Sequence, residues 1–468
     1  MPTLVFRYGL FLLFPVAGIA QYIASNRSYS IGMGLFALFV VLLLLLLLIQ
    51  RKDALRLSFT RESKVVFLLV AIVLLGYVRA YMFDNTLVTL PVALVMPNIC
   101  LLGAVLGSLV ACNFPRFDFV RIMMSSYILF FVVNLLMLVL GIKNVAIEST
   151  YLQEMDSIFG VASHRIVLPL STGLSDSSII GLISGACVVV LAATIRRKEI
   201  FSWLFKKSIF AVLFACSIFS IMLSGNRFPL FMTLFIVLYG ILSSYRSYKV
   251  VLFISLLLFA FPLLYLPFQL VLAASPISEL LVGLSRTGDI SEVFTLNNRT
   301  IIWEVVLAKL AADVGWFTVV FGYGFQGQAI SGVIADYSAI FDLSYQNSDL
   351  ISVHSSILQI LINYGIAGLL MWGYCIYKSV EQLWNNYVGA VNGRGYMLLM
   401  LSIVAAGAIE ASLAPASSAF LLFLLIASHQ LNIRAILDKK AGYRLYPQSF
   451  LNHHRGRENE SLCGCAGT

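Results

Sequence analysis

The chain has 468 residues, of which 60% are hydrophobic and only 11% are charged, and its mean hydropathy is +0.93. Soluble domains carry about 25% charged residues, so this composition excludes a soluble globular protein and indicates an integral membrane protein. The net charge of +9 would suit a nucleic-acid partner, but the positions of the basic residues indicate a different role.

Apolar stretches long enough to cross a bilayer recur along nearly the whole chain. A spanning helix needs about 20 consecutive apolar residues. We therefore predict an all-α, polytopic membrane protein with twelve transmembrane helices and one large polar loop. The predicted spans are 8–24, 31–50, 65–83, 88–112, 121–142, 171–195, 208–224, 228–244, 250–270, 356–377, 396–413 and 416–433.

The predicted domain organisation follows from these spans. Residues 1–270 hold the first nine helices, 271–355 form the large loop with amphipathic segments, 356–433 hold the last three helices, and 434–468 form a polar tail. In a polytopic membrane protein, a large loop of mixed polar and apolar character is a favoured place for chemistry or recognition.

Lys and Arg residues are concentrated on one side of the predicted membrane. If the N-terminus is cytoplasmic, the basic segments 51–64, 196–207 and 434–468 all fall on the cytoplasmic side. This distribution satisfies the positive-inside rule. We therefore expect both termini in the cytoplasm and the large loop outside it. Basicity encodes orientation in the membrane, and no nucleic-acid partner is predicted.

Two arginines on the predicted outer face are candidate ligands for an anion. Arg227 lies in the short turn 224–229 between two spans, where the alternative is a side chain that snorkels to water. Arg299 begins a predicted amphipathic helix, 299–310. A positive charge is unfavourable at a helix N-terminus, and a bound anion would remove that conflict. The alternatives for Arg299 are a pair with Glu304 or a solvated first turn of the helix.

His354 is the candidate general base. It stands directly before the apolar run 357–377, at the N-terminus of a predicted span. The helix dipole there disfavours a positive charge on the imidazole, and a neutral ring can accept a proton. A structural role at the membrane boundary is the alternative.

Further residues on the outer face are secondary candidates. Arg79 and Arg286 would add to an anion pocket, and Glu410 would orient an arginine or act as an alternative base. For Arg79 and Glu410 the simpler interpretation is an ion pair near the outer interface. The Gly-rich run Phe321-Gly322-Tyr323-Gly324-Phe325 follows no predicted strand, so it predicts a flexible, closely packed turn instead of a nucleotide-binding loop.

The residue types on this face indicate a chemistry that needs neither a metal nor a cofactor. The sequence has no Asp-x-Asp motif and no His/Cys cluster with metal-ligand spacing there. Arginines suit a substrate that brings its own phosphate charge. A diphosphate leaves as a stable anion, so arginines can stabilise it while a histidine activates an acceptor hydroxyl. A sugar linked to a polyprenyl diphosphate is such a donor.

Several short segments between about 220 and 375 share one predicted side of the membrane. They are Ser224-Gly225-Asn226-Arg227, Asn298-Arg299 with Trp303, Phe321-Gly322-Tyr323-Gly324, His354 with Leu358-Gln359, and Tyr364-Gly365-Ile366-Ala367-Gly368-Leu369. Their order and spacing resemble the O-antigen ligase and O-antigen polymerase family of bacterial surface polysaccharide assembly. Ser355 departs from the Asn that many relatives carry after the His.

The resemblance implies a helical, metal-independent glycosyltransferase of the bacterial inner membrane with its site on the periplasmic face. Its donor would be a glycan on undecaprenyl diphosphate, with Arg227 and Arg299 at the diphosphate and His354 at the acceptor hydroxyl. The acceptor would be a sugar of the lipid A core, for a ligase, or the next lipid-linked repeat unit, for a polymerase. The residues do not separate these two activities.

A transporter, such as a flippase for lipid-linked sugars, is the alternative from another functional class. Such a protein is expected to line its path with ionisable groups at mid-membrane depth. The ionisable residues Arg79, Asp84, Asp176 and Glu410 all lie toward the predicted outer ends of spans. This distribution favours the enzyme.

Overall fold

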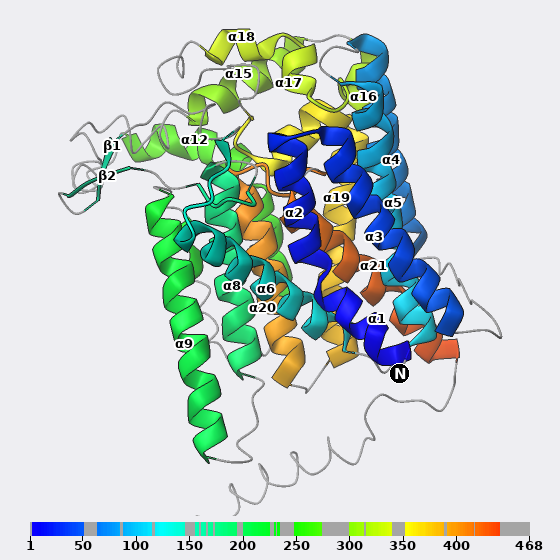
Figure 1. The fold of residues 1–468 in the computed structure, drawn as a ribbon. Helices are drawn as coiled ribbons and strands as arrows, with labels where there is room; N and C mark the ends of the chain where they lie inside the picture. Colours follow the sequence, from blue (N-terminus) through cyan, green and yellow to red (C-terminus); the bar gives the residue numbers. More distant parts are fainter. Residues whose placement is uncertain are drawn as a thin grey trace, which may run out of the picture.

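The computed structural model is a bundle of long helices with short helices lying across one end (Figure 1). The two kinds of element differ in sequence, since the long helices come from the predicted spans and the short ones from the predicted large loop. The residues that the structure describes are 2–50, 63–84, 88–114, 118–145, 155–158, 161–164, 167–171, 174–193, 200–224, 229–230, 232–234, 248–273, 299–312, 315–338, 352–387, 391–415 and 417–439.

Helices make up nearly all of the described chain, which confirms the predicted all-α class. The described exception is a short antiparallel hairpin of two strands, β1 and β2. In chain order the elements are α1 (Pro2–Phe11), α2 (Leu13–Asn26), α3 (Tyr29–Gln50), α4 (Ser63–Phe83), α5 (Leu90–Asn113), α6 (Phe119–Val139), β1 (Met155–Ile158), β2 (Val161–His164), α8 (Leu174–Ala193), α9 (Ile200–Leu223), α11 (Tyr248–Phe259), α12 (Phe261–Ala273), α15 (Arg299–Ala312), α16 (Trp316–Phe321), α17 (Gly327–Ile330), α18 (Val333–Ser338), α19 (Ser356–Tyr387), α20 (Val391–Ile409) and α21 (Ser418–Lys439).

The helices have the length and composition of a multi-pass membrane protein. Among the described residues, six helices are long and apolar enough to cross a membrane, or eight if each of two bent pairs forms one span. Three shorter apolar helices, Lys207–Leu223, Gly395–Ala408 and Ser418–Ile433, coincide with further predicted spans. The predicted span 228–244 lies mostly outside the described residues. The total of twelve therefore stays a prediction.

Prolines break two of the predicted spans, which were expected to be continuous helices. The axes of α1 and α2 differ by 46°, and those of α11 and α12 by 66°. A proline ring clashes with the carbonyl four residues before it and cannot donate a helical hydrogen bond. Pro15 stands four residues after Phe11, where α1 ends, and Pro262 stands four residues after Leu258, near the end of α11.

A glycine breaks α19 close to its beginning. Gly365 has φ 64° and ψ −163°, outside the helical region. In a continuous helix, the carbonyls of Ile362 and Asn363 would accept hydrogen bonds from N–H groups four residues later, and the break removes these donors. The backbone N–H groups of Tyr323 and Gly324 donate to these two carbonyls instead, each at 2.8 Å. The Gly-rich run of the loop thereby satisfies the backbone of the broken helix.

The same Gly-rich run also docks against α4. The N–H of Phe325 donates to the carbonyl of Gly76 at 3.0 Å, and the ring of Phe325 stacks on Tyr77 with centroids 4.2 Å apart. A Cβ added at Gly324 would lie only 2.8 Å from the Gly76 oxygen, and Gly324 has φ +103°. The predicted close packing of this turn is confirmed, because no larger residue fits there.

Small and polar residues hold the long helices together. A Cβ added at Gly107 of α5 would lie 2.1 Å from the hydroxyl oxygen of Ser428 on α21. On the same pair of helices, the Asn432 side chain donates to the Ser108 hydroxyl at 2.8 Å. Close backbone approach and interhelical hydrogen bonds of this kind are typical of helix packing in membranes.

Replacing Gly365 should destabilise the protein far more than replacing another glycine of the same helix. In Gly365→Ala, the new Cβ would lie 2.4 Å from the backbone carbonyl carbon of Val320, at a φ of +64°. We expect a loss of about 2 kcal/mol or more of unfolding free energy. The control is Gly373→Ala, whose Cβ meets no atom within 4 Å. Thermal unfolding in detergent, followed by tryptophan fluorescence, compares the two, and equal midpoints would contradict the close packing.

Candidate active site

Three of the predicted site residues come together in one chain of contacts. Nη2 of Arg299 lies 2.5 Å from Oε1 of Glu410. The other carboxylate oxygen, Oε2, lies 3.1 Å from Nδ1 of His354. Arg299 begins α15, His354 precedes α19, and Glu410 directly follows α20, so three separate parts of the chain build this group.

Burial makes the Glu410 carboxylate dependent on these partners. Its side chain is 1% exposed, while those of Arg299 and His354 are 17% and 11% exposed. A buried carboxylate is costly unless it is paired and hydrogen-bonded. An ionised carboxylate only accepts hydrogen bonds, so the contact with His354 places the imidazole proton on Nδ1. In the neutral ring the lone pair then lies on Nε2.

The backbone of His354 is held in a conformation that few residues adopt. Its φ of +50° lies in the left-handed region, where histidine is less rare than most residues with a side chain. The preceding residue, Val353, is fixed on both sides. Its N–H donates to Oε1 of Gln359 at 3.2 Å, and its carbonyl accepts from Nε1 of Trp303 at 3.1 Å. Such a conformation persists where the surroundings over-determine it.

A network of buried amides lies next to this turn. Nε2 of Gln359 donates to Oε1 of Gln328 at 2.8 Å and to Oδ1 of Asn363 at 3.0 Å. The same Asn363 oxygen accepts from the N–H of Gly327 at 2.9 Å. The network joins α17 to the first part of α19. The sequence contained Gln359 only as part of the family resemblance, and its position at the His354 turn was not predicted.

Ser356 connects the two segments that carry His354 and Glu410. Its hydroxyl donates to the backbone carbonyl of Glu410 at 2.8 Å and accepts from the N–H of Leu413 at 3.0 Å. The turn after α20 is thereby fixed on the first residue of α19. This serine, which was not a predicted site residue, positions the Glu410 backbone.

The predicted conflict at the start of α15 is resolved by the protein itself. Arg299 places a positive charge at a helix N-terminus, where an anion is favourable. The structure supplies the Glu410 carboxylate there. The alternative of a pair between Arg299 and Glu304 is wrong, because among the described contacts the guanidinium of Arg299 pairs with Glu410 and not with Glu304. The predicted amphipathic helix is confirmed, with Ile302 and Trp303 buried.

Arg79 has a different set of contacts. Its guanidinium donates to the carbonyl of Gly322 and to the hydroxyl of Thr318, the latter at 3.3 Å. It also lies 5.3 Å from the ring centroid of Phe83 and 4.8 Å from that of Phe317. These contacts tie the end of α4 to α16 and to the Gly-rich run.

Two candidate arginines cannot be placed. Arg227 and Arg286 lie outside the described residues, as do Asn298 and the tail from 440 to 468. The predicted role of Arg227 at an anion therefore stays a prediction. Over the part of the chain that is described, no group of three His, Cys, Asp or Glu side chains could hold a metal ion.

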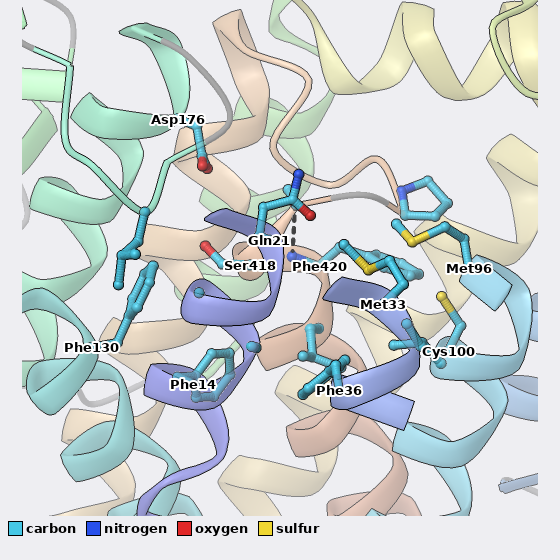
Figure 2. Close-up of a pocket in the computed structure, with 17 residues that line it drawn as sticks. Phe14, Gln21, Met33, Phe36, Met96, Cys100, Phe130, Asp176, Ser418 and Phe420 are labelled. Atoms are coloured by element: carbon cyan, nitrogen blue, oxygen red, sulfur yellow. Dashed lines mark hydrogen bonds between the residues drawn. The ribbon is translucent and has the colours of Figure 1, made fainter. Parts of the chain in front are cut away.

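A small cavity of about 70 Å³ lies elsewhere in the bundle. Figure 2 shows it among apolar side chains of α2, α3, α5 and α21, with Gln21, Asp176 and Ser418 as polar groups. None of the predicted site residues lines it. Its wall includes Pro415 and Ser417, which belong to the same linker that begins at Glu410. The cavity and the Arg299–Glu410–His354 group are thus separate features.

Comparison of the sequence with protein-family models and with curated proteins finds no significant match. The function must therefore be inferred from the chemistry of the site.

Replacing Gln359 should destabilise the turn that carries His354. Gln359→Leu removes the acceptor of the Val353 N–H and the donor to two other amides, leaving buried polar groups unsatisfied. Such losses cost about 1–3 kcal/mol each. The control is Gln21→Leu, which changes a residue of the apolar cavity. The midpoint temperature of thermal unfolding should fall clearly for Gln359→Leu and little for Gln21→Leu. Equal stability of both variants would show that the amide network does not hold the turn.

Proposed function

We propose that the protein is a membrane glycosyltransferase of the O-antigen ligase or polymerase type. It would transfer a glycan from undecaprenyl diphosphate to a hydroxyl acceptor without a metal or cofactor. The observation that carries the proposal is the contact chain from Arg299 through Glu410 to His354. It combines a histidine oriented by a carboxylate with an arginine next to it, which suits a base and an anion ligand in one site.

The proposed base is the Nε2 atom of His354. Glu410 holds the ring by its Nδ1–H, so the lone pair of the neutral ring is on Nε2. As the acceptor oxygen attacks the anomeric carbon of the donor sugar, its proton passes to Nε2. The bond from that carbon to the diphosphate oxygen breaks, and the diphosphate leaves with the electron pair. The carboxylate of Glu410 then stabilises the imidazolium that has formed.

Arg299 is the proposed ligand of the leaving diphosphate. A guanidinium offers five N–H donors in a planar fork, and the observed hydrogen bond to Glu410 is made from Nη2. Arg299 would thus bridge the diphosphate and the carboxylate that orients His354. Arg227 is the proposed second ligand, and Arg286 a further one, both in segments outside the described residues.

The proposed orientation rests on the distribution of basic residues. The segments rich in Lys and Arg support a cytoplasmic position for both termini and a periplasmic position for the segment 271–355. The proposed location is the bacterial inner membrane, with twelve spans. The donor and an acceptor on lipid A core or on a lipid-linked repeat unit would then meet at the periplasmic face. This orientation places the site where surface polysaccharide is assembled.

Transfer by purified variants tests the roles of the base and of the carboxylate. His354→Ala should lower the rate of glycan transfer by about 10²- to 10⁴-fold, because it removes the proton acceptor. Glu410→Gln should lower it by about 10²-fold or more, because an amide nitrogen at this position would favour the other tautomer of the histidine.

The matched control for these variants is Glu304→Gln on the exposed face of α15. It removes a carboxylate near Arg299 without touching the contact chain, so full activity is expected. Thermal unfolding confirms that each variant is folded. A folded His354→Ala protein with unchanged transfer would overturn the proposal.

Arg299→Lys separates donor binding from base activation. Lysine keeps a positive charge toward Glu410 but loses the planar fork that matches a phosphate. A charge-assisted hydrogen bond contributes about 1.5–3 kcal/mol, so the KM for the lipid-linked donor should rise by about 10-fold or more. If the KM for the acceptor rises instead, Arg299 binds the acceptor and not the donor, which would contradict its proposed role.

Cells that lack the protein distinguish the two activities of the family. Long glycan chains that remain on the carrier lipid indicate a lost ligase, and single repeat units indicate a lost polymerase. Complementation with His354→Ala should reproduce the defect, and complementation with Glu304→Gln should repair it. An unchanged surface polysaccharide in the deletion strain would contradict both activities.

A further inference from the structure

The outward face of α4 is a continuous apolar stripe. Leu68, Leu75 and Met82 stand seven residues apart and are 52%, 60% and 79% exposed, and Phe83 at the end of the helix is 63% exposed. Residues seven apart lie on the same side of a helix. Because α4 is long and apolar enough to cross a membrane, this stripe is the part of α4 that meets lipid.

The short helix α16 extends the stripe beyond the end of α4. Trp316 and Phe317 are 73% and 48% exposed. The Arg79 guanidinium lies over the rings of both Phe83 and Phe317, which brings the two aromatic residues to one place. Figure 1 shows α16 beside this end of α4. The exposed apolar surface therefore passes from a spanning helix onto a helix of the predicted polar loop.

The opposite side of α16 packs against the break in α19. A Cβ added at Gly365 would lie 2.4 Å from the carbonyl carbon of Val320, and one added at Gly322 would lie 2.3 Å from the carbonyl carbon of Asn363. With no room for even one methyl group on this side, α16 cannot turn its aromatic residues inward. Over the described part of the chain, nothing covers these exposed rings.

We propose that Met82, Phe83, Trp316 and Phe317 form a membrane-interface surface that inserts at the boundary between lipid headgroups and acyl chains. Tryptophan suits this depth because its ring combines an apolar body with a polar N–H group, and the phenylalanine rings beside it would face the acyl chains. Arg79 lies between two of the rings, so its aliphatic part can stay in the apolar layer. Its guanidinium donates to the Gly322 carbonyl and to the Thr318 hydroxyl. The continuity of the patch with the lipid-facing stripe of α4 identifies lipid as the partner.

This surface would set the depth of the site relative to the membrane. α16 connects directly to the Gly-rich run, and that run is bonded to the helix break of α19, which begins beside His354. Insertion of α16 would therefore hold the break at a fixed height. The inference stands independently of the proposed enzymatic activity, because it rests on exposure and packing alone.

Fluorescence quenching in vesicles tests the proposal. The full chain is reconstituted in phosphatidylethanolamine and phosphatidylglycerol vesicles that contain nitroxide-labelled lipid. The emission of Trp316 is obtained as the difference between the wild type and Trp316→Phe. Most of this difference should be lost with a nitroxide at carbon 5 of the acyl chain, less with one at carbon 12, and little with aqueous iodide. The control is Trp372→Phe, since Trp372 is fully buried and its contribution should respond to no quencher.

Two results would overturn the proposal. Strong quenching of Trp316 by iodide, with little effect of the lipid nitroxide, would place α16 in water. Insensitivity to both quenchers would mean that another protein, such as a second copy of this chain, covers the patch. A second measurement needs no variant: Met82, when lipid covers it, should resist oxidation by aqueous peroxide, and rapid oxidation in intact vesicles would also contradict the proposal.

Discussion

The break of α19 at Gly365 leaves two backbone carbonyls that a membrane environment cannot hydrate, and much of the described site depends on how they are satisfied. In lipid every backbone polar group needs a partner within the protein. Tyr323 and Gly324 supply the donors. Because the next residue of the run bonds to Gly76 of α4, one turn of the loop ties two long helices together beside the segment that carries His354.

A buried carboxylate imposes the second constraint. The Glu410 side chain is buried, and its two carboxylate oxygens contact Nη2 of Arg299 and Nδ1 of His354. Removing either partner would leave a poorly compensated charge. The Glu410 carboxylate therefore links Arg299 to His354. The hydrogen bond from Ser356, the first residue of α19, to the Glu410 carbonyl fixes the turn that carries this carboxylate. In the proposed mechanism, this carboxylate orients the imidazole of His354.

The two constraints act on one small region at one end of the bundle. The Gly-rich run is held by close backbone contacts, which tolerate no added side chain, whereas the polar group is held by directional hydrogen bonds. This division of tasks suits the proposed site. Steric contacts define where the helices end, and the hydrogen bonds define where the side chains point.

Composition, hydropathy and basic residues by themselves determined the fold class, the membrane setting and most helix positions, since each of these depends on the local solvent preference of the chain. They also identified Arg299, His354 and Glu410 as candidates, because a charged or titratable residue at a membrane boundary is costly and therefore noticeable. The proline breaks were open to prediction in principle from Pro15 and Pro262, although the spans were predicted as continuous.

Only the tertiary structure decided which of these residues meet. Glu410 stands 111 residues from Arg299 and 56 from His354, and no local pattern pairs residues at such separations. At Arg299 the structure places the carboxylate of Glu410, and Arg79 contacts α16 and the Gly-rich run. The local sequence shows whether a segment needs lipid, water or a charged partner around it. Which partner meets that requirement depends on how the helices pack, and packing is a property of the whole chain.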